Sequence, residues 1–489
     1  MGELADPRKR RIVLVSILLA NFMVAMEATI VATAMPHIVG EIGGFACYTW
    51  VFSGYLLAQC TMTLIFGGLA DIFGRNPIMI LGIAVFLAGS LLAGFSTSML
   101  WLIAFRLLQG IGAGAIQPMV ITMIGDLYTV SERGRIQAIV ATVWAGAAVI
   151  GPLTGAFIVA HLSWGWIFWI NLPIGLVTIA GLAGYLKVEV SPKSARIDYG
   201  GAVTFAIANV SLLVLLTGTG IGTATWIALA AICITSAILF IAFEMRAADP
   251  MISIALWGRP LIAASNAASF LAGIAFIGVT TVMPLYVQGV MGHTAVVAGF
   301  TLTTLLVGWT LSMSFCNWLY AALGVRGALR LGGMALPLGA ALLLLLTPHS
   351  SPVFASLGSL GMGMGMGLIS ITSIVQVQES VEWSMRGSAT SSIIFSRSLG
   401  NALGATVMGA VLNVGIAHFG RGGQAEALKH LLNTPEGLAH LYDKPVLVPV
   451  FDAALHWSFG GMLVIAFLTL AAAWLMPIAS GEQTSRTAD

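Results

Sequence analysis

Runs of about 20 apolar residues alternate with short polar breaks along most of the chain. A helix needs about that many apolar residues to cross a bilayer, whereas transmembrane β-strands are short segments of alternating polarity. The continuous runs therefore predict membrane-spanning helices. Fourteen are expected, at residues 12–35, 46–70, 77–96, 99–124, 137–160, 164–186, 200–218, 222–243, 261–288, 296–319, 330–347, 352–375, 391–414 and 453–476.

Composition supports an integral membrane protein, because 58% of the residues are hydrophobic and only 8% are charged. Soluble domains carry about 25% charged residues. The first run is longer than the apolar region of a signal peptide, and no clear cleavage site follows it, so we interpret it as a retained helix. The four cysteines lack metal-binding spacing and are expected to be buried small side chains. They are Cys47, Cys60, Cys233 and Cys316.

Lysine and arginine positions predict the orientation, since positive residues accumulate on the cytoplasmic side of a membrane. Most of the 21 lie at the amino end, in alternate breaks or in the carboxyl-terminal tail. These are Arg8, Lys9, Arg10, Arg11, Arg75, Arg133, Arg135, Lys187, Lys193, Arg196, Arg246, Arg259, Arg326, Arg330, Arg386 and Arg486. Both termini are therefore predicted to be cytoplasmic, in a multi-pass protein of the cell membrane. Arg106 and Arg397 are exceptions, because they lie inside predicted spans.

An internal repeat predicts the domain organisation. GPLTG at 151–155 and GNALG at 400–404 place the same Gly-xxx-Gly step at matching positions of a first and a last block of six spans. The fold class expected is an all-α membrane protein with 6+2+6 helices, in which two six-helix bundles surround a central cavity. The bundles are expected at 1–186 and 261–489, with two extra helices and their cytoplasmic linkers at 187–260 and an outer loop at 415–452.

Two charged side chains inside spans are the strongest candidates for chemistry. Glu27 is the only charge in residues 12–35, and a carboxylate at mid-membrane costs about 2.5–3.5 kcal/mol on insertion scales. Arg106 shares a helix face with Gln109 and Gln117, and its guanidinium needs a partner or water. A carboxyl exposed alternately to two environments can switch protonation near neutral pH, as a proton carrier requires. The alternative is a static Glu27–Arg106 bridge.

Two further stretches have simpler interpretations. Asp71, Arg75 and Asp126 lie at neighbouring cytoplasmic helix ends, which indicates an ionic latch rather than solvated loop charges. GMGMGMG at 361–367 lies inside an apolar span with no preceding strand, so it is interpreted as a surface for close helix packing and not as a nucleotide-binding loop.

Five motifs in order resemble the major facilitator superfamily, specifically its fourteen-helix drug/proton antiporter branch. They are MEATIVATAMP (26–36), GGLADIFGRNPIM (67–79), LIAFRLLQGIGAG (102–114), IGPLTGA (150–156) and SWGWIFWINLPIG (163–175). The chain departs from the family pattern in several places. Glu27 replaces the usual aspartate, Ile72 and Asn76 replace basic residues, Gly165 replaces an arginine, and Ala147 and Ala156 replace glycines.

The resemblance implies a role for each motif. Glu27 would be the proton-coupling acid, with Arg106 as its partner in proton transfer. Asp71, Arg75 and Asp126 would form the cytoplasmic latch. Gly151, Pro152 and Gly155 would form the antiporter motif, whose bend in the fifth helix suits the protein to antiport.

The function predicted is an exporter that exchanges protons for small amphipathic or hydrophobic compounds, which includes drug efflux and antibiotic resistance. Aromatic and amide side chains are candidates for the substrate cavity: Tyr55, Gln59, Gln117, Trp144, Asn171 and Gln288. No enzyme activity, metal, nucleic-acid partner or cofactor is expected, since the proton gradient would drive the cycle. The chain is expected to be a monomer unless a periplasmic adaptor binds it. A transporter of lipids or lipid-like metabolites and a non-transporting sensor or scaffold are the alternatives.

Overall fold

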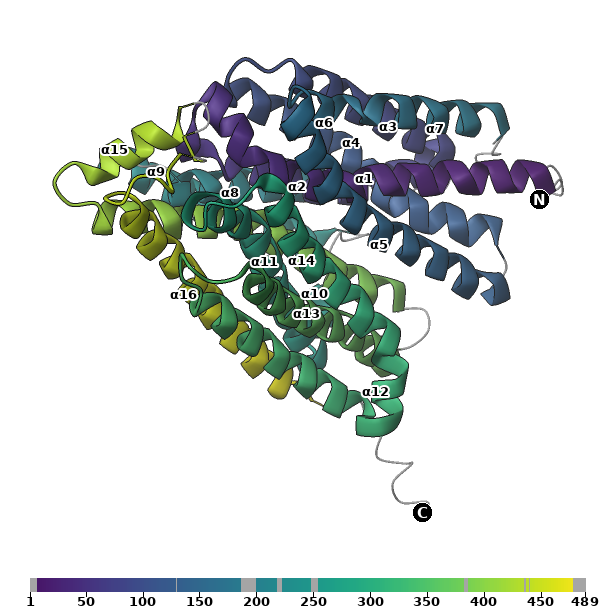
Figure 1. Cartoon of the computed structure of the whole chain (residues 1–489). Helices are drawn as coiled ribbons and strands as arrows, with labels where there is room; N and C mark the ends of the chain where they lie inside the picture. The colour runs from purple at the N-terminus through teal and green to yellow at the C-terminus, as the bar shows by residue number, and fades with distance from the viewer. Residues whose placement is uncertain are drawn as a thin grey trace. The chain divides into compact units, whose positions relative to one another are not determined.

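The apolar runs fold into long α-helices in a computed structural model of the chain (Figure 1). The structure describes residues 7–128, 130–185, 199–217, 222–247, 254–381, 386–434, 437–438 and 440–477. No strand occurs among these residues, which confirms the prediction of an all-α protein. Thirteen helices in the described part are long and apolar enough to cross a membrane. The apolar segment at Gly200–Leu212 is shorter, so the count of fourteen stays a prediction.

The chain divides into two compact units, Met1–Met251 and Ile252–Asp489. The first unit contains α1 (Pro7–Ile42), η2 (Phe45–Cys47), α2 (Trp50–Phe73), α3 (Arg75–Gly94), α4 (Met99–Leu127), α5 (Val130–His161), α6 (Trp166–Trp169), α7 (Asn171–Tyr185), α8 (Tyr199–Thr217) and α9 (Thr223–Arg246). The second contains α10 (Ile254–Trp257), α11 (Pro260–Leu285), the π-helical turn η3 (Tyr286–Val290), α12 (Ala295–Leu344), α13 (Pro352–Ser380), α14 (Arg386–Phe419), α15 (Gln424–Leu432) and α16 (Val448–Trp474).

Helix packing in the first unit places α1 and α4 where they can hold a buried site. The helix α1 packs against α5, α7 and α4, while α4 packs against α2 and α3. Apolar side chains of these helices form one core, which includes Met23, Ile83, Phe86 and Ile116. The helices α8 and α9 pack mainly against each other, and only 6% of the most apolar window of α9 is buried.

The second unit repeats one packing arrangement of the first. The helix α11 packs against α14 and α16, and α12 packs against α13. The repeated Gly-xxx-Gly steps lie in two close helix pairs. The step on α5 faces α1, and the step on α14 faces α11. A Cβ atom added at Gly155 would meet the Ile30 carbonyl oxygen at 2.7 Å, and one added at Gly404 would meet that of Ile274 at 2.8 Å.

The glycine-rich segment at 361–367 packs as predicted, because its backbone lies directly against α12. A Cβ atom at Gly363 would meet the Leu305 carbonyl oxygen, and one at Gly367 would meet that of Trp309 at 2.6 Å. Small residues permit this backbone approach between membrane helices.

The break expected between residues 319 and 330 is present, because the non-helical backbone of Gly324 (φ 69°, ψ 167°) divides α12 into two helices. Two details differ from the sequence-based predictions. The outer loop expected at 415–452 is shorter than predicted, since α14 extends to Phe419, α16 begins at Val448 and α15 lies between them. Cys47 is exposed rather than buried, because it lies in the short turn η2 between two spans.

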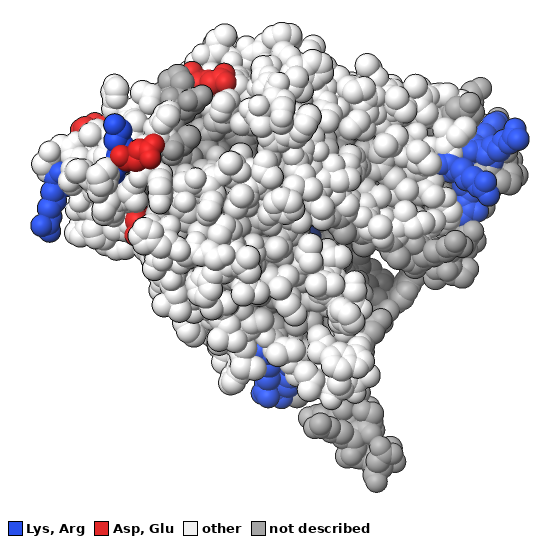
Figure 2. Space-filling model, in the orientation of Figure 1, with Lys and Arg blue, Asp and Glu red and all other residues white. Residues whose placement is uncertain are grey.

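Charged side chains gather at the ends of the helices in each unit (Figure 2). Figure 2 shows basic side chains together at one end of the first unit, and charges of both signs gathered at one end of the second, with an uncharged surface over the helices. This distribution is expected of helices whose middle sections face hydrocarbon.

Candidate functional site

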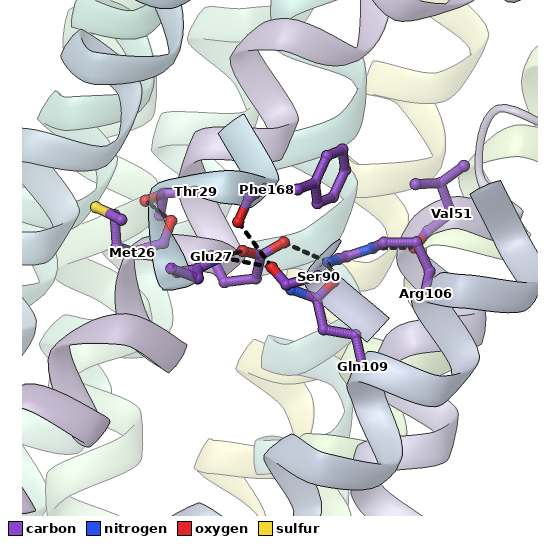
Figure 3. Close-up of polar contacts among 9 residues, drawn as sticks. Met26, Glu27, Thr29, Val51, Ser90, Arg106, Gln109 and Phe168 are labelled. Carbon is purple, nitrogen blue, oxygen red and sulfur yellow. Dashed lines mark hydrogen bonds and ion pairs between the residues drawn. The ribbon is translucent and has the colours of Figure 1, made fainter. Parts of the chain in front are cut away.

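Glu27 and Arg106 form a buried ion pair in the first unit (Figure 3). Arg106 Nη1 on α4 donates to Glu27 Oε1 on α1 at 2.5 Å. Glu27 is 0% exposed and Arg106 is 1% exposed, so both charges are sealed from solvent. Removal of either partner would leave the other charge buried and uncompensated, which costs about 3–5 kcal/mol in measured cases.

Three further groups hold the Arg106 guanidinium. Nη1 also donates to Gln109 Oε1 at 2.6 Å, and Nε donates to the Val51 carbonyl oxygen at 3.2 Å. The Tyr55 ring lies against the guanidinium, with 4.1 Å between its centroid and Arg106 Cζ. A cation over an aromatic face is stabilised by the ring quadrupole. The side chain is therefore fixed by contacts from both α2 and α4.

Asn171 holds the second oxygen of Glu27. Its Nδ2 donates to Glu27 Oε2 at 2.7 Å and lies 3.0 Å from Ser90 Oγ. Ser90 Oγ also accepts from Gln109 Nε2 at 3.1 Å and donates to the Phe168 carbonyl oxygen at 2.9 Å. With Val51 and Tyr55 of α2, the network joins α1, α2, α3, α4, α6 and α7, so a change in the charge of the Glu27 carboxyl group would reach six helices.

Local sequence explains how the network is assembled. Arg106 and Gln109 are three residues apart and therefore share a face of α4. Gly89 precedes Ser90 on α3, and a Cβ atom there would meet the backbone nitrogen of Gln109 at 2.5 Å. The glycine lets α3 approach α4 closely, which brings the Ser90 hydroxyl within reach of the Gln109 amide.

The six predicted cavity residues have three kinds of surroundings. Tyr55 and Asn171 are buried and belong to the Glu27–Arg106 network. Gln59 and Gln117 are half-buried, and no side-chain hydrogen bond joins them to another described residue. Two candidates remain. Trp144 Nε1 donates to Asn21 Oδ1 at 3.1 Å in the first unit. Gln288 lies in η3 of the second unit, and its Nε2 has no hydrogen-bond partner among the described residues.

The antiporter motif lies directly against the helix that carries Glu27. Pro152 is inside α5. A Cβ atom at Gly151 would meet the Thr29 hydroxyl oxygen, and one at Gly155 would meet that of Thr33 at 2.6 Å. Both threonines are on α1, downstream of Glu27. The motif therefore fixes how closely α5 approaches α1 beside the ion pair.

The expected latch is only partly described. Arg75 is half-buried at the start of α3, directly after Gly74, whose φ of 88° makes the turn from α2. The side chains of Asp71 and Asp126 lie outside the described residues. The ionic contacts of the latch therefore stay a prediction.

Several contributors to the network were not found from the sequence. Ser90 is a single hydroxyl in an apolar span, and Val51 and Phe168 contribute backbone oxygens. Neither kind of group has a distinctive pattern along the chain. The three-residue spacing to Arg106 was the only signal for Gln109. No group of three potential metal ligands was found among the described residues.

Comparisons with known proteins agree with this architecture. The model of the Major Facilitator Superfamily matches residues 17–405. The chain is 34% identical over 417 residues to Multidrug transporter protein MdtP of Bacillus subtilis (strain 168), which covers 84% of the chain and 77% of that protein. It is also 34% identical to Multidrug resistance protein 3 of the same organism, with coverages of 83% and 80%.

A solved structure shows the same fold at low sequence identity. A bacterial homologue of the human lysosomal transporter Spinster aligns with a TM-score of 0.66 and 16% identity, over 96% of this chain and 97% of that chain. This likeness and the family match confirm the predicted fold class.

Proposed function

The chain belongs to the major facilitator superfamily of membrane transporters, and we propose that it exports small amphipathic or hydrophobic compounds in exchange for protons. The observation that carries this proposal is the sealed Glu27–Arg106 pair in a helical bundle of transporter fold. A carboxylate inside a membrane-spanning helix is costly, so it indicates a functional role rather than a purely structural one. The names of the two Bacillus relatives support drug-like cargo.

Glu27 would carry the proton. Its two oxygens accept hydrogen bonds from Arg106 and Asn171, so each oxygen has a partner in the sealed arrangement. Protonation would remove the charge that Arg106 faces and make one oxygen a donor. The six-helix network would then have a second arrangement, and the cycle would alternate between the two.

We place the chain in the fourteen-helix drug/proton antiporter branch, with both ends cytoplasmic. Basic residues at the helix ends support this orientation. The test uses a variant with the four native cysteines replaced by serine and single cysteine tags added. Tags at the two ends should not react with an impermeant reagent in intact cells, whereas a tag near Gly422 should react. Labelling of either end from outside would contradict the orientation.

The test of coupling is proton-driven uptake of a panel of hydrophobic compounds into inverted vesicles. Glu27→Gln should reduce uptake to background, because an amide cannot take up and release a proton. Glu27→Asp should retain part of it. Glu41→Gln is a matched control on the same helix, because Glu41 lies at the end of α1 and contacts His37 and Trp164. Full uptake by Glu27→Gln would show that Glu27 is only a static bridge partner.

A further inference from the structure

The second unit contains an arginine whose surroundings differ from those of Arg106. Arg397 lies on α14 within the candidate membrane span Ser392–Phe419 and is half-buried. Its Nη1 donates to Ser370 Oγ on α13 at 2.9 Å, and its Cζ is 5.8 Å from the centroid of Trp309 on α12. Among the described residues, no carboxylate forms an ion pair with it.

The described acids of the second unit have no contact with Arg397. Glu379 is nine residues beyond Ser370 on α13, about 14 Å along the helix axis. Asp452 on α16 lies 3.1 Å from His456 Nδ1 and is thereby engaged. The described acids Glu426 and Asp443 lie in the segment between α14 and α16. None of these carboxylates neutralises Arg397.

An intramembrane guanidinium without an acid has donors to spare. Arginine presents five N–H groups, and one hydrogen bond from Arg397 to a described protein group is present. Such a charge inside a membrane helix is costly unless a partner or water solvates it. An anionic oxygen group is the partner that a guanidinium binds best, through charge-assisted and bidentate hydrogen bonds.

Nearby polar atoms could complete a binding site for such a group. Ser373 is one helical turn from Ser370, is fully buried, and its hydroxyl has no hydrogen-bond partner among the described residues. Trp309 packs edge-on against Phe276, with 5.4 Å between their ring centroids. The Ser370 hydroxyl and the Trp309 ring thus lie at the cation, and the Ser373 hydroxyl lies one helical turn from Ser370.

We propose that Arg397 and Ser370 bind a single anionic oxygen group, such as a carboxylate, on an amphipathic molecule whose apolar part packs near Trp309. This proposal rests on the proposed transport function and names the class of cargo. The site would recognise one anionic group beside an apolar part of the same molecule. A lipid headgroup and a free aryl carboxylate both have the anionic group, and the experiment distinguishes them.

The test is equilibrium binding of radiolabelled 2-naphthoate to the full chain in nanodiscs of phosphatidylcholine, with neutral 2-naphthamide as a competitor. The naphthoate should bind about tenfold more tightly than the amide in the wild type. Arg397→Gln should bring that ratio close to one, and Arg397→Lys should keep most of it because the charge remains. Arg421→Gln, on the exposed turn before α15, is the matched control and should not change the ratio.

A ratio near one in the wild type, or an unchanged ratio in a folded Arg397→Gln, would overturn the proposal. If Arg397→Gln unfolds, as its melting curve would show, Ser370→Ala replaces it and should lower the ratio severalfold; an unchanged ratio there would also overturn it. Addition of phosphatidylglycerol identifies the occupant as a lipid headgroup if the lipid displaces naphthoate, and as free cargo if it does not. The assay uses no proton gradient, so it remains informative if proton coupling fails.

Discussion

Arg106 and Arg397 are both arginines within membrane-length helices, and each guanidinium lies near an aromatic ring. Arg106 is sealed and has a carboxylate, an amide and a backbone carbonyl as acceptors. Arg397 is half-buried and has one serine hydroxyl. The charge of Arg106 is therefore balanced inside the protein, so only a proton or a rearrangement can change the balance. No described carboxylate balances the charge of Arg397, and under our proposal the anion of another molecule would balance it.

The turns at Gly74, between α2 and α3, and at Gly324, between the two halves of α12, show a second contrast. Gly74 (φ 88°, ψ 152°) and Gly324 (φ 69°, ψ 167°) have similar backbone angles, and a basic residue follows each, Arg75 directly and Arg326 two positions later. Three residues before Gly74 is Asp71, whereas Ala321 occupies that place in the second unit. The backbone geometry is repeated while the acid is not.

The largest effect is expected from removal of the charge of Arg106. Arg106→Gln should lower the free energy of unfolding by about 3–5 kcal/mol, because Glu27 is left as a buried charge without its partner. The double variant Glu27→Gln/Arg106→Gln should recover most of that loss, which denaturant unfolding in detergent can measure. If the double variant instead loses as much as the two single variants together, the two side chains do not act as a pair.

A smaller effect is expected when each arginine is replaced by lysine, which keeps the charge but lacks the planar guanidinium group. Arg106→Lys should reduce proton-driven uptake about tenfold or more, since a lysine lacks the fork that reaches Glu27, Gln109 and the Val51 carbonyl together. Arg397→Lys should reduce uptake of an aryl carboxylate by about threefold or less, because a single anion can still bind an ammonium group. Initial rates in inverted vesicles provide the comparison. Equal losses would remove the distinction between the two sites.

The smallest effect is expected at the turns. Arg75→Ala should increase labelling of cysteines placed in the cytoplasmic half of the cavity, because Asp71 and Asp126 would lose their basic neighbour. Arg326→Ala should change this labelling less, since Ala321 stands where the first unit has an acid. The rate of reaction with a thiol reagent in inverted vesicles measures the difference. An equal change in both variants would assign the latch to the turns themselves and not to the acids.

Much of the fold could be predicted because every helix that crosses the hydrocarbon core needs a run of about 20 apolar residues. Run length predicted the membrane helices, and the Gly-xxx-Gly steps predicted matching helix pairs in the two units. The break predicted between residues 319 and 330 was confirmed, since the backbone of Gly324 leaves the helical conformation there. The helix α15 was missed because the outer segment lies outside the apolar runs from which helices were predicted.

The candidate site was only partly predictable from the chain. Glu27 and Arg106 were found because intramembrane charges are rare, and their contact followed from their need for a partner. Asn171 was expected to line the substrate cavity, and in the structure its amide donates a hydrogen bond to Glu27. The sequence does not distinguish an amide that binds substrate from one that binds a neighbouring carboxylate. The distinction between Arg106 and Arg397 depends on which acids lie near each one, which only the packing of the helices determines.

The position of the ion pair in the chain has a consequence for biosynthesis. Glu27 emerges from the ribosome 79 residues before Arg106 and 144 residues before Asn171. At about 5–20 residues per second, the helix α1 waits on the order of 4–16 s for the arginine that neutralises its carboxylate. During that interval the acid is an unpartnered group in a newly inserted helix. We therefore expect Glu27→Gln to insert at least as efficiently as the wild type, and the cost of the uncompensated Arg106 charge to arise only later, when α4 packs against α1.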